Sequence, residues 1–176
     1  MGRIIVEAQR PAAILHCRDF TSIEVARALE AIAPLDGVAG NNDGPEMVAR
    51  FGRRKIIAVE DIRVGLLHGD GKRGTTPQRA LTAFADEAVD VILFGHSHIP
   101  SCVRCGGLWL INPGSPTDKR GQARFSFAVL DIDGAAVDAR LVFFEGTPSV
   151  PKRVGRRADL GVSVLRRHGR GSGSQP

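Results

Sequence analysis

Two histidines at the end of an apolar segment are the residues of this sequence best suited to chemistry. Residues 91–94 read Val-Ile-Leu-Phe and lead through Gly95 to His96, Ser97 and His98. A glycine lets the backbone turn sharply there, so both imidazoles can reach toward one point. Imidazole nitrogen is a common ligand of divalent transition metals. Taken alone, such a pair more often represents two loop histidines. A metal site therefore requires further ligands elsewhere in the chain.

Three other strand-like segments also end near a polar side chain that can bind a metal. These residues are Asp19, Asn41 and His68, which follow the segments 12–17, 35–40 and 63–67. Ligands of layered α/β folds bind at the carboxyl ends of strands. The donors are oxygen and nitrogen without a thiolate, which suits Mn, Fe, Co, Ni or Zn better than a structural cysteine-zinc site. We therefore expect four strands to present metal ligands at one edge.

In the first part of the chain, the predicted helices alternate with strands. In the last part, the predicted elements are antiparallel strands. A cap at Thr21-Ser22 precedes a helical pattern, and Asp133-Gly134 indicates a hairpin. Cys102 and Cys105 read as two hairpin residues rather than as a redox or zinc half-site. We predict helices over residues 23–32, 45–51 and 77–87, and strands over residues 55–59, 63–67, 89–94, 108–111, 125–132 and 136–144.

Composition predicts one domain followed by a basic tail. The chain has 176 residues with 43% hydrophobic content, enough for one core. Residues 151–176 hold seven Lys or Arg and one acid, so the tail carries +6 and residues 1–150 carry −1. We expect a domain over 1–150 and a disordered tail over 151–176. The absence of a long apolar run and of a secretory signal, with three cysteines, predicts a cytoplasmic protein with reduced thiols and no membrane span.

Five short motifs, in order along the chain, resemble those of the calcineurin-like metallophosphoesterases and, within them, the YfcE-like phosphodiesterases. They are Arg18-Asp19, Gly40-Asn41, His68-Gly69, Gly95-His96-Ser97-His98 and Asn112-Pro113-Gly114-Ser115. The family has Gly-Asp, Gly-Asn, His-Gly, Gly-His-x-His and Asn-Pro-Gly-Ser at these places. The match runs from roughly Pro11 to Phe144. The resemblance implies an α/β fold in which two sheets form a sandwich flanked by helices (αββα).

The resemblance also implies a metal-dependent phosphoesterase that hydrolyses a small phosphodiester substrate through a metal-activated water. Asp19 would bridge two divalent metals, with Mn²⁺ expected first and Ni²⁺, Fe²⁺, Co²⁺ or Zn²⁺ as alternatives. The implied catalytic residues and ligands of one metal are Asp19, Asn41, His68 and His96, and His98 would bind the other. The implied substrate-binding residues are Asn112, Gly114, Ser115 and Arg120.

The sequence departs from the family pattern in three places. Family members open with a strand ending in Asp-x-His, which this sequence lacks. Residues 7–11 are too few for a crossover helix after a strand at residues 3–6, so we expect the first strand and helix to be missing and catalysis to be weakened. Arg18 replaces the family's Gly and would place a cation beside the bridging carboxylate. Asn42 stands where many members have a proton-donating His, which favours aryl or activated diesters.

Two alternative functions remain at this stage. The incomplete first metal position favours a non-catalytic, protein-binding scaffold, as the retromer subunit of this fold is. The basic tail could give a weak contact with nucleic acid, although it lacks interleaved aromatic residues. A homo-oligomer is also compatible with the sequence.

Overall fold

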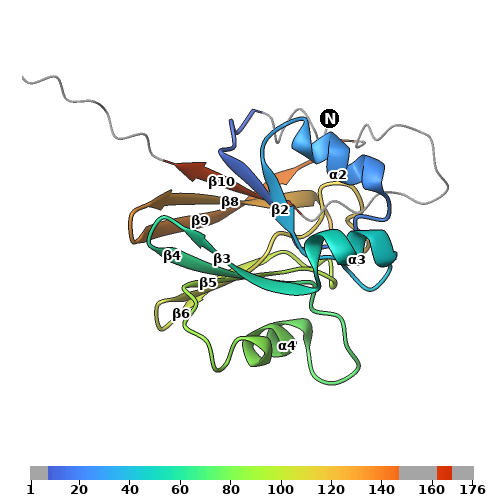
Figure 1. Ribbon diagram of the computed structural model, residues 1–176. Coiled ribbons are helices and arrows are strands. Elements are labelled where there is room, and N and C mark those ends of the chain that lie inside the picture. Colours follow the sequence, from blue (N-terminus) through green and yellow to red (C-terminus); the bar gives the residue numbers. More distant parts are fainter. Residues whose placement is uncertain (1–7, 147–161, 168–176) are drawn as a thin grey trace, which may run out of the picture.

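Two five-stranded sheets pack face to face, with helices on their outer faces (Figure 1). The computed structural model describes residues 8–146 and 162–167. The strand order is β2-β1-β10-β8-β9 in the first sheet and β3-β4-β5-β7-β6 in the second. This arrangement confirms the expected αββα sandwich.

The first sheet combines segments from widely separated parts of the chain. Its strands are β1 (Ala13–His16), β2 (Leu35–Gly37), β8 (Phe125–Asp133), β9 (Ala136–Phe144) and β10 (Val162–Arg167). β1 runs parallel to β2 and antiparallel to β10, whereas β10 runs parallel to β8. The helices α2 (Ile23–Glu30) and α3 (Pro45–Phe51) follow β1 and β2 and cover the outer face of this sheet.

The second sheet comes from one continuous stretch of chain. Its strands are β3 (Arg54–Val59), β4 (Ile62–Leu67), β5 (Val91–Phe94), β6 (Ser101–Cys105) and β7 (Leu108–Asn112). β4, β5 and β7 run parallel, and β3 and β6 close the edges as antiparallel hairpin strands. The helix α4 (Thr76–Ala83) links β4 to β5 and packs on the outer face.

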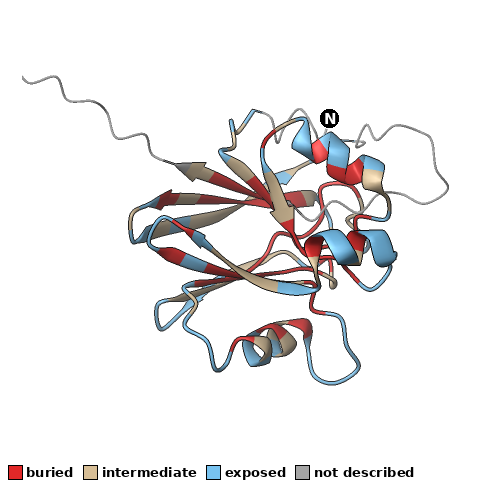
Figure 2. Cartoon of the chain, in the orientation of Figure 1, coloured by how far each residue is buried: buried red, intermediate tan, exposed pale blue. Residues whose placement is uncertain are grey.

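Strand alternation divides the core into layers. On β8, Phe127 and Val129 face the helices of the first sheet, whereas Ala128 and Leu130 face the second sheet. Side chains of successive strand residues point to opposite faces, which explains this division. Phe84, next to α4, packs with Phe94 of β5 in a third cluster. Figure 2 shows the buried residues concentrated along the strands.

Most sequence-predicted elements are confirmed, with one correction in the tail. The helix at 45–51 and the strand at 136–144 have the predicted bounds, whereas α4 ends at Ala83 rather than at residue 87. The expected disorder of residues 151–176 is wrong for Val162–Arg167, which form β10 between β1 and β8. Val164 and Leu165 are buried there. The net positive charge of residues 151–176 as a whole gave no indication of this apolar pair.

Residues 3–6 and the rest of the tail lie outside the described residues. Within the described ranges, the helices are all too short or too polar to cross a membrane.

Candidate metal centre

Four polar side chains meet where the two sheets present the ends of their strands. Asp19 and Asn41 lie in the loops after β1 and β2, and His68 and His96 lie in the loops after β4 and β5. Each strand pair is parallel, so its carboxyl ends lie at the same edge. Asp19 and His68 are buried, His96 is half-buried and Asn41 is exposed. The group therefore has a buried base and a solvent-facing side.

His68 lies at the centre of this group. Its Nδ1 is 3.1 Å from the carbonyl oxygen of Cys17. A carbonyl only accepts hydrogen bonds, so Nδ1 carries the proton and Nε2 carries the lone pair. Nε2 is 3.1 Å from Asn41 Oδ1, 3.7 Å from Asp19 Oδ2 and 3.2 Å from His96 Nδ1. Three ligand-type atoms thus lie around His68 Nε2, an arrangement that a cation would stabilise.

The protonation of the two histidines agrees with a ligand role. Burial lowers the pKa of His68, against the opposing effects of the Asp19 carboxylate and the Cys17 carbonyl. Burial and the adjacent His68 also lower the pKa of His96. Both imidazoles are therefore neutral near pH 7, which is the form that binds metals.

The donor chemistry fits a divalent cation, provided that the amide oxygen is counted. Within residues 8–146 and 162–167, no three His, Cys, Asp or Glu side chains are grouped to hold a metal. Asp19, His68, His96 and the amide oxygen of Asn41 nevertheless supply two nitrogens and two oxygens, in contacts that all involve His68 Nε2 rather than in a closed ligand group. Such a set suits Mn²⁺, Fe²⁺, Co²⁺, Ni²⁺ or Zn²⁺.

Asn42 holds the carboxylate of Asp19 in place. The backbone N–H of Asn42 donates to Asp19 Oδ1 at 2.7 Å, and its side-chain Nδ2 donates to Oδ2 at 3.1 Å. Gly40 permits the close approach, because a Cβ at this position would lie 2.2 Å from Asp19 Oδ1. Asn42 is thus a positioning residue, whereas the sequence indicated only that it cannot donate a proton.

Asp43 joins the two ligand loops of the first sheet. Its carboxylate is buried and accepts from three backbone N–H groups: Phe20 at 3.0 Å, Thr21 at 2.8 Å and Gly40 at 2.8 Å. The sequence read Asp43-Gly44 as a turn or a substitute acid. Phe20, one partner of Asp43, is 23 residues away in the chain. The local sequence around Asp43 therefore gave no indication of this contact. Asp43 fixes the spacing between the loops of Asp19 and Asn41.

The loop after β5 is held in an unusual backbone conformation. His96 and His98 have φ values of 63° and 61°, in the left-handed region that costs non-glycine residues of order 1 kcal/mol or more. Asn112 stabilises this loop by donating to the Gly95 carbonyl at 2.9 Å and to Ser97 Oγ at 3.0 Å. Strain at two adjacent candidate ligands is typical of a functional loop.

His98 has a hydrogen-bond contact of its own, separate from those that join the other four candidate ligands. It is 1% exposed, and its Nδ1 lies 2.6 Å from the carbonyl oxygen of Asp118. This contact places the proton on Nδ1, as in His68. The predicted role of His98 as a ligand of another metal stays a prediction.

The predicted substrate-binding residues form a braced turn. Asn112 Oδ1 accepts from the Gly114 N–H at 3.0 Å, and Ser115 Oγ accepts from the Asp118 N–H at 2.9 Å. Gly114 has a φ of 71° and no room for a Cβ beside Ser126 Oγ. Arg120 is exposed. The buried groups shape the turn, and their contact with substrate stays a prediction.

Arg18 lies within the fold beside the centre. It is fully buried, and its Cγ would be 2.8 Å from a Cβ on Gly95. The charge of Arg18 contributes to the lowered pKa of His68. This agrees with the expectation that the Arg18 side chain is a cation close to the candidate ligands.

The three cysteines are free. Burial raises the pKa of the Cys17 thiol far above its ordinary value, so this thiol is inert. Cys102 and Cys105 lie on the hairpin strand β6, as predicted.

Two packed sheets, outer helices and candidate oxygen and nitrogen ligands at the strand ends give the chain the architecture of the αββα class. Residues 3–135 match the family model of the calcineurin-like phosphoesterase superfamily domain. The chain belongs to this superfamily, which confirms the resemblance seen in its motifs. A probable metallophosphoesterase of Methanothermobacter thermautotrophicus is 37% identical over 130 residues, which cover 73% of this chain and 74% of that protein.

Solved structures share the fold. Vps29 of Entamoeba histolytica, complexed with Zn²⁺, is 20% identical, with a TM-score of 0.62 over 81% of this chain and 87% of that one. A novel archaeal phosphodiesterase is 18% identical, with a TM-score of 0.61 over 80% of this chain and 88% of that one. At these identities the likeness shows the architecture alone.

Proposed function

We propose that this chain is a metal-dependent phosphodiesterase whose divalent cation is held by Asp19, Asn41, His68 and His96. The meeting of the ligand-type atoms of Asp19, Asn41 and His96 at His68 Nε2 is the observation that carries the proposal. The superfamily membership supports a metal-dependent phosphoesterase. The phosphodiester preference and Mn²⁺ as the preferred metal are the finer parts of the proposal.

The residues of the chain orient the reaction. A bound divalent cation would lower the pKa of a coordinated water and neutralise charge on the phosphoryl oxygens. The Cys17 carbonyl fixes the ring of His68, and Asn42 fixes the carboxylate of Asp19. Exposed Asn41 and half-buried His96 form the side from which a substrate can approach.

The surroundings of Asn41 determine which leaving groups can depart. Asn42 cannot donate a catalytic proton, and the carboxylate of Asp43 is committed to three backbone N–H groups. The leaving oxygen therefore receives no proton from either side chain. Diesters with acidic alcohols, such as aryl esters, should react faster than alkyl monoesters.

The proposal is tested by hydrolysis of bis(4-nitrophenyl) phosphate with Mn²⁺, in comparison with the same assay in excess chelator. Turnover should require the metal and fall at least about a hundredfold in His96→Ala, because an essential ligand is lost. Val103→Ala is the control, since Val103 is exposed on β6. Folded, metal-loaded protein without turnover would contradict the proposal.

A non-catalytic scaffold is the second candidate, and one observation favours it. Asn42 occupies both oxygens of Asp19 and so competes with a metal for that carboxylate. The discriminating measurement is calorimetric titration with Zn²⁺ and Mn²⁺. A folded chain that binds neither metal would favour the scaffold, and binding that His68→Ala abolishes would favour the enzyme. Tail-mediated nucleic-acid contact and oligomerisation stay predictions.

A further inference from the structure

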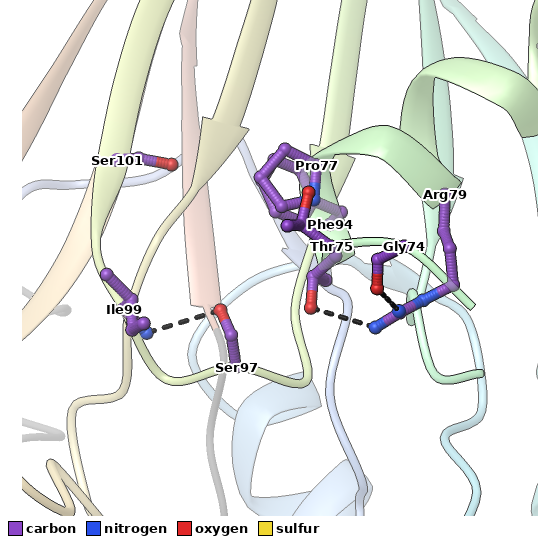
Figure 3. Close-up of a pocket in the computed structure, with 9 residues that line it drawn as sticks. Gly74, Thr75, Pro77, Arg79, Phe94, Ser97, Ile99 and Ser101 are labelled. Carbon is purple, nitrogen blue, oxygen red and sulfur yellow. Dashed lines mark hydrogen bonds between the residues drawn. The ribbon is translucent and has the colours of Figure 1, made fainter. Parts of the chain in front are cut away.

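A pocket of about 350 Å³ lies between the start of α4 and the loop after β5 (Figure 3). One wall comes from the loop at residues 74–77 and from Arg79, and the other from Ser97, Ile99 and Ser101. Phe94 of β5 contributes from between these walls. Ser97 separates His96 from His98 in sequence, and Gly69, which contacts Arg79, follows His68 directly. The pocket is thus continuous with two of the candidate ligand loops.

Arg79 shapes the pocket, and most of its N–H groups are bonded within the loop. Its Nε donates to the Gly69 carbonyl at 2.9 Å, and one terminal nitrogen donates to the carbonyls of Gly74 at 2.6 Å and Arg73 at 3.2 Å. The other terminal nitrogen donates to Thr76 Oγ1 at 3.0 Å. Each guanidinium nitrogen therefore has an acceptor within the loop, and the loop wall is fixed.

The lining of the pocket is otherwise neutral. It contains no carboxylate, and its remaining side chains are apolar or carry hydroxyl groups. Pro77, Phe94 and Ile99 supply the apolar surface, and Ile99 remains 56% exposed. A cation would have no partner here, and an anion would find only the Arg79 guanidinium, whose three nitrogens are already bonded within the loop. Either would lose hydration on entry. A neutral group with an apolar ring would instead gain by burying its surface.

The volume agrees with one ring system. An apolar cavity of about 150 Å³ can already hold benzene, and small-molecule pockets begin at roughly 300 Å³. The pocket therefore has room for a substituted ring but is at the small end for a larger ligand.

We infer that this pocket binds the neutral, ring-bearing ester group of a phosphoester whose phosphoryl group lies at the metal centre. The inference rests on the proposed function and adds the class of organic group that the substrate carries. Ile99 is a specificity-determining residue under this proposal, because it forms the exposed edge of the pocket.

Binding of the ring is tested first without metal or catalysis. Titration of phenol into the metal-free ¹⁵N-labelled chain should shift the amide resonances of Gly74, Thr75, Thr76 and Ile99. The variant Ile99→Trp should remove these shifts by filling the pocket. Val103→Trp is the matched control, since Val103 is also an exposed apolar residue but lies outside the pocket. Shifts absent from these amides, or unchanged in Ile99→Trp, would overturn the proposal.

The same variants are then compared with two inhibitors of the hydrolysis reaction that differ only in the ring. Phenyl phosphate should inhibit about tenfold more tightly than methyl phosphate, a ratio equivalent to 1.4 kcal/mol. Ile99→Trp should remove this advantage and Val103→Trp should keep it.

The outcomes separate the two proposals. Hydrolysis without any preference for the ring would overturn the pocket assignment and leave the proposed function standing. Phenol shifts in a chain that hydrolyses nothing would support the pocket and overturn the function.

Discussion

The two sheets are built differently and hold their ligands by different means. The second sheet uses the continuous stretch from residue 54 to 112, whereas the first sheet combines strands near both ends of the described chain. In the first sheet, polar side chains fix the ligand loops: Asn42 holds Asp19, and Asp43 ties two loops together. In the second, a strained turn after a buried strand presents His96, and a single polar side chain, Asn112, braces that turn.

This difference indicates where the site is vulnerable. The geometry on the side of the first sheet depends on a few hydrogen bonds and on a remote strand. The geometry on the side of the second sheet depends on packing within one stretch of chain. Substitutions in the first sheet should therefore affect stability and metal binding more than comparable substitutions in the second.

The largest effect on stability should come from a substitution that disrupts the packing of β10 between β1 and β8. Val164 is fully buried in β10 against the helices of the first sheet. Val164→Asp places an unpaired charge in this core and should lower the free energy of unfolding by about 4 kcal/mol or more. Urea denaturation measures the change. Val103→Asp, at an exposed position of edge strand β6, should change it by less than about 0.5 kcal/mol. Equal effects would refute the assigned place of β10.

Asp43 provides the next comparison between the sheets. Asp43→Ala leaves two buried backbone N–H groups and one partly buried one without their charged acceptor and should cost about 3 kcal/mol of unfolding free energy. Asn112→Ala, the corresponding change in the second sheet, leaves the Gly114 N–H, the Gly95 carbonyl and Ser97 Oγ without this partner. These bonds involve no charged group, so the change should cost about 2 kcal/mol. Asp43→Asn keeps one acceptor oxygen, so its cost in unfolding free energy should lie between those of the wild-type chain and Asp43→Ala. A larger cost for Asn112→Ala in thermal or urea unfolding would reverse the comparison.

Gly40 sharpens the comparison at the ligands themselves. A Cβ at Gly40 would meet Asp19 Oδ1 at 2.2 Å and His68 Cε1 at 2.9 Å. Gly40→Ala should therefore displace both ligands and weaken Zn²⁺ binding by about tenfold to a hundredfold. Gly44→Ala is the control, because a Cβ there has open space. Calorimetric titration checks both variants, and unchanged affinity in Gly40→Ala would refute the close packing.

The smallest effect concerns pH and the second sheet. The ordinary pKa of histidine is 6.5, and burial lowers the pKa of both His68 and His96 in the folded chain. The unfolded chain therefore binds protons first as the pH falls, so the metal-free protein should lose stability below about pH 6.5 and be most stable above it. His68→Gln should flatten this dependence in urea titrations between pH 8 and pH 5. An unchanged slope would show that other groups dominate.

The sequence predicts elements whose signals are local. The helix at 45–51 has its proline at the start, and the hairpin at residues 54–67 has its polar turn, so both were recognisable. The meeting of Asp19, Asn41, His68 and His96 followed from polar residues at strand ends. By contrast, β10 was missed because its place depends on partners far away in the chain. The bracing role of Asp43 was missed for the same reason, since two of its three hydrogen-bond partners, Phe20 and Thr21, lie on another loop.

The place of β10 also has a consequence for the order in which the protein folds. β1 pairs with β10 through Ala13 and Leu165, near the two ends of the described chain. During synthesis, the second sheet can form once residue 112 has emerged, but the first sheet must wait for residues 162–167. Until then the strands β1 and β8 have unpaired edges toward each other, and such edges promote association between chains. A newly made chain should therefore be most prone to aggregation just before β10 is inserted between β1 and β8.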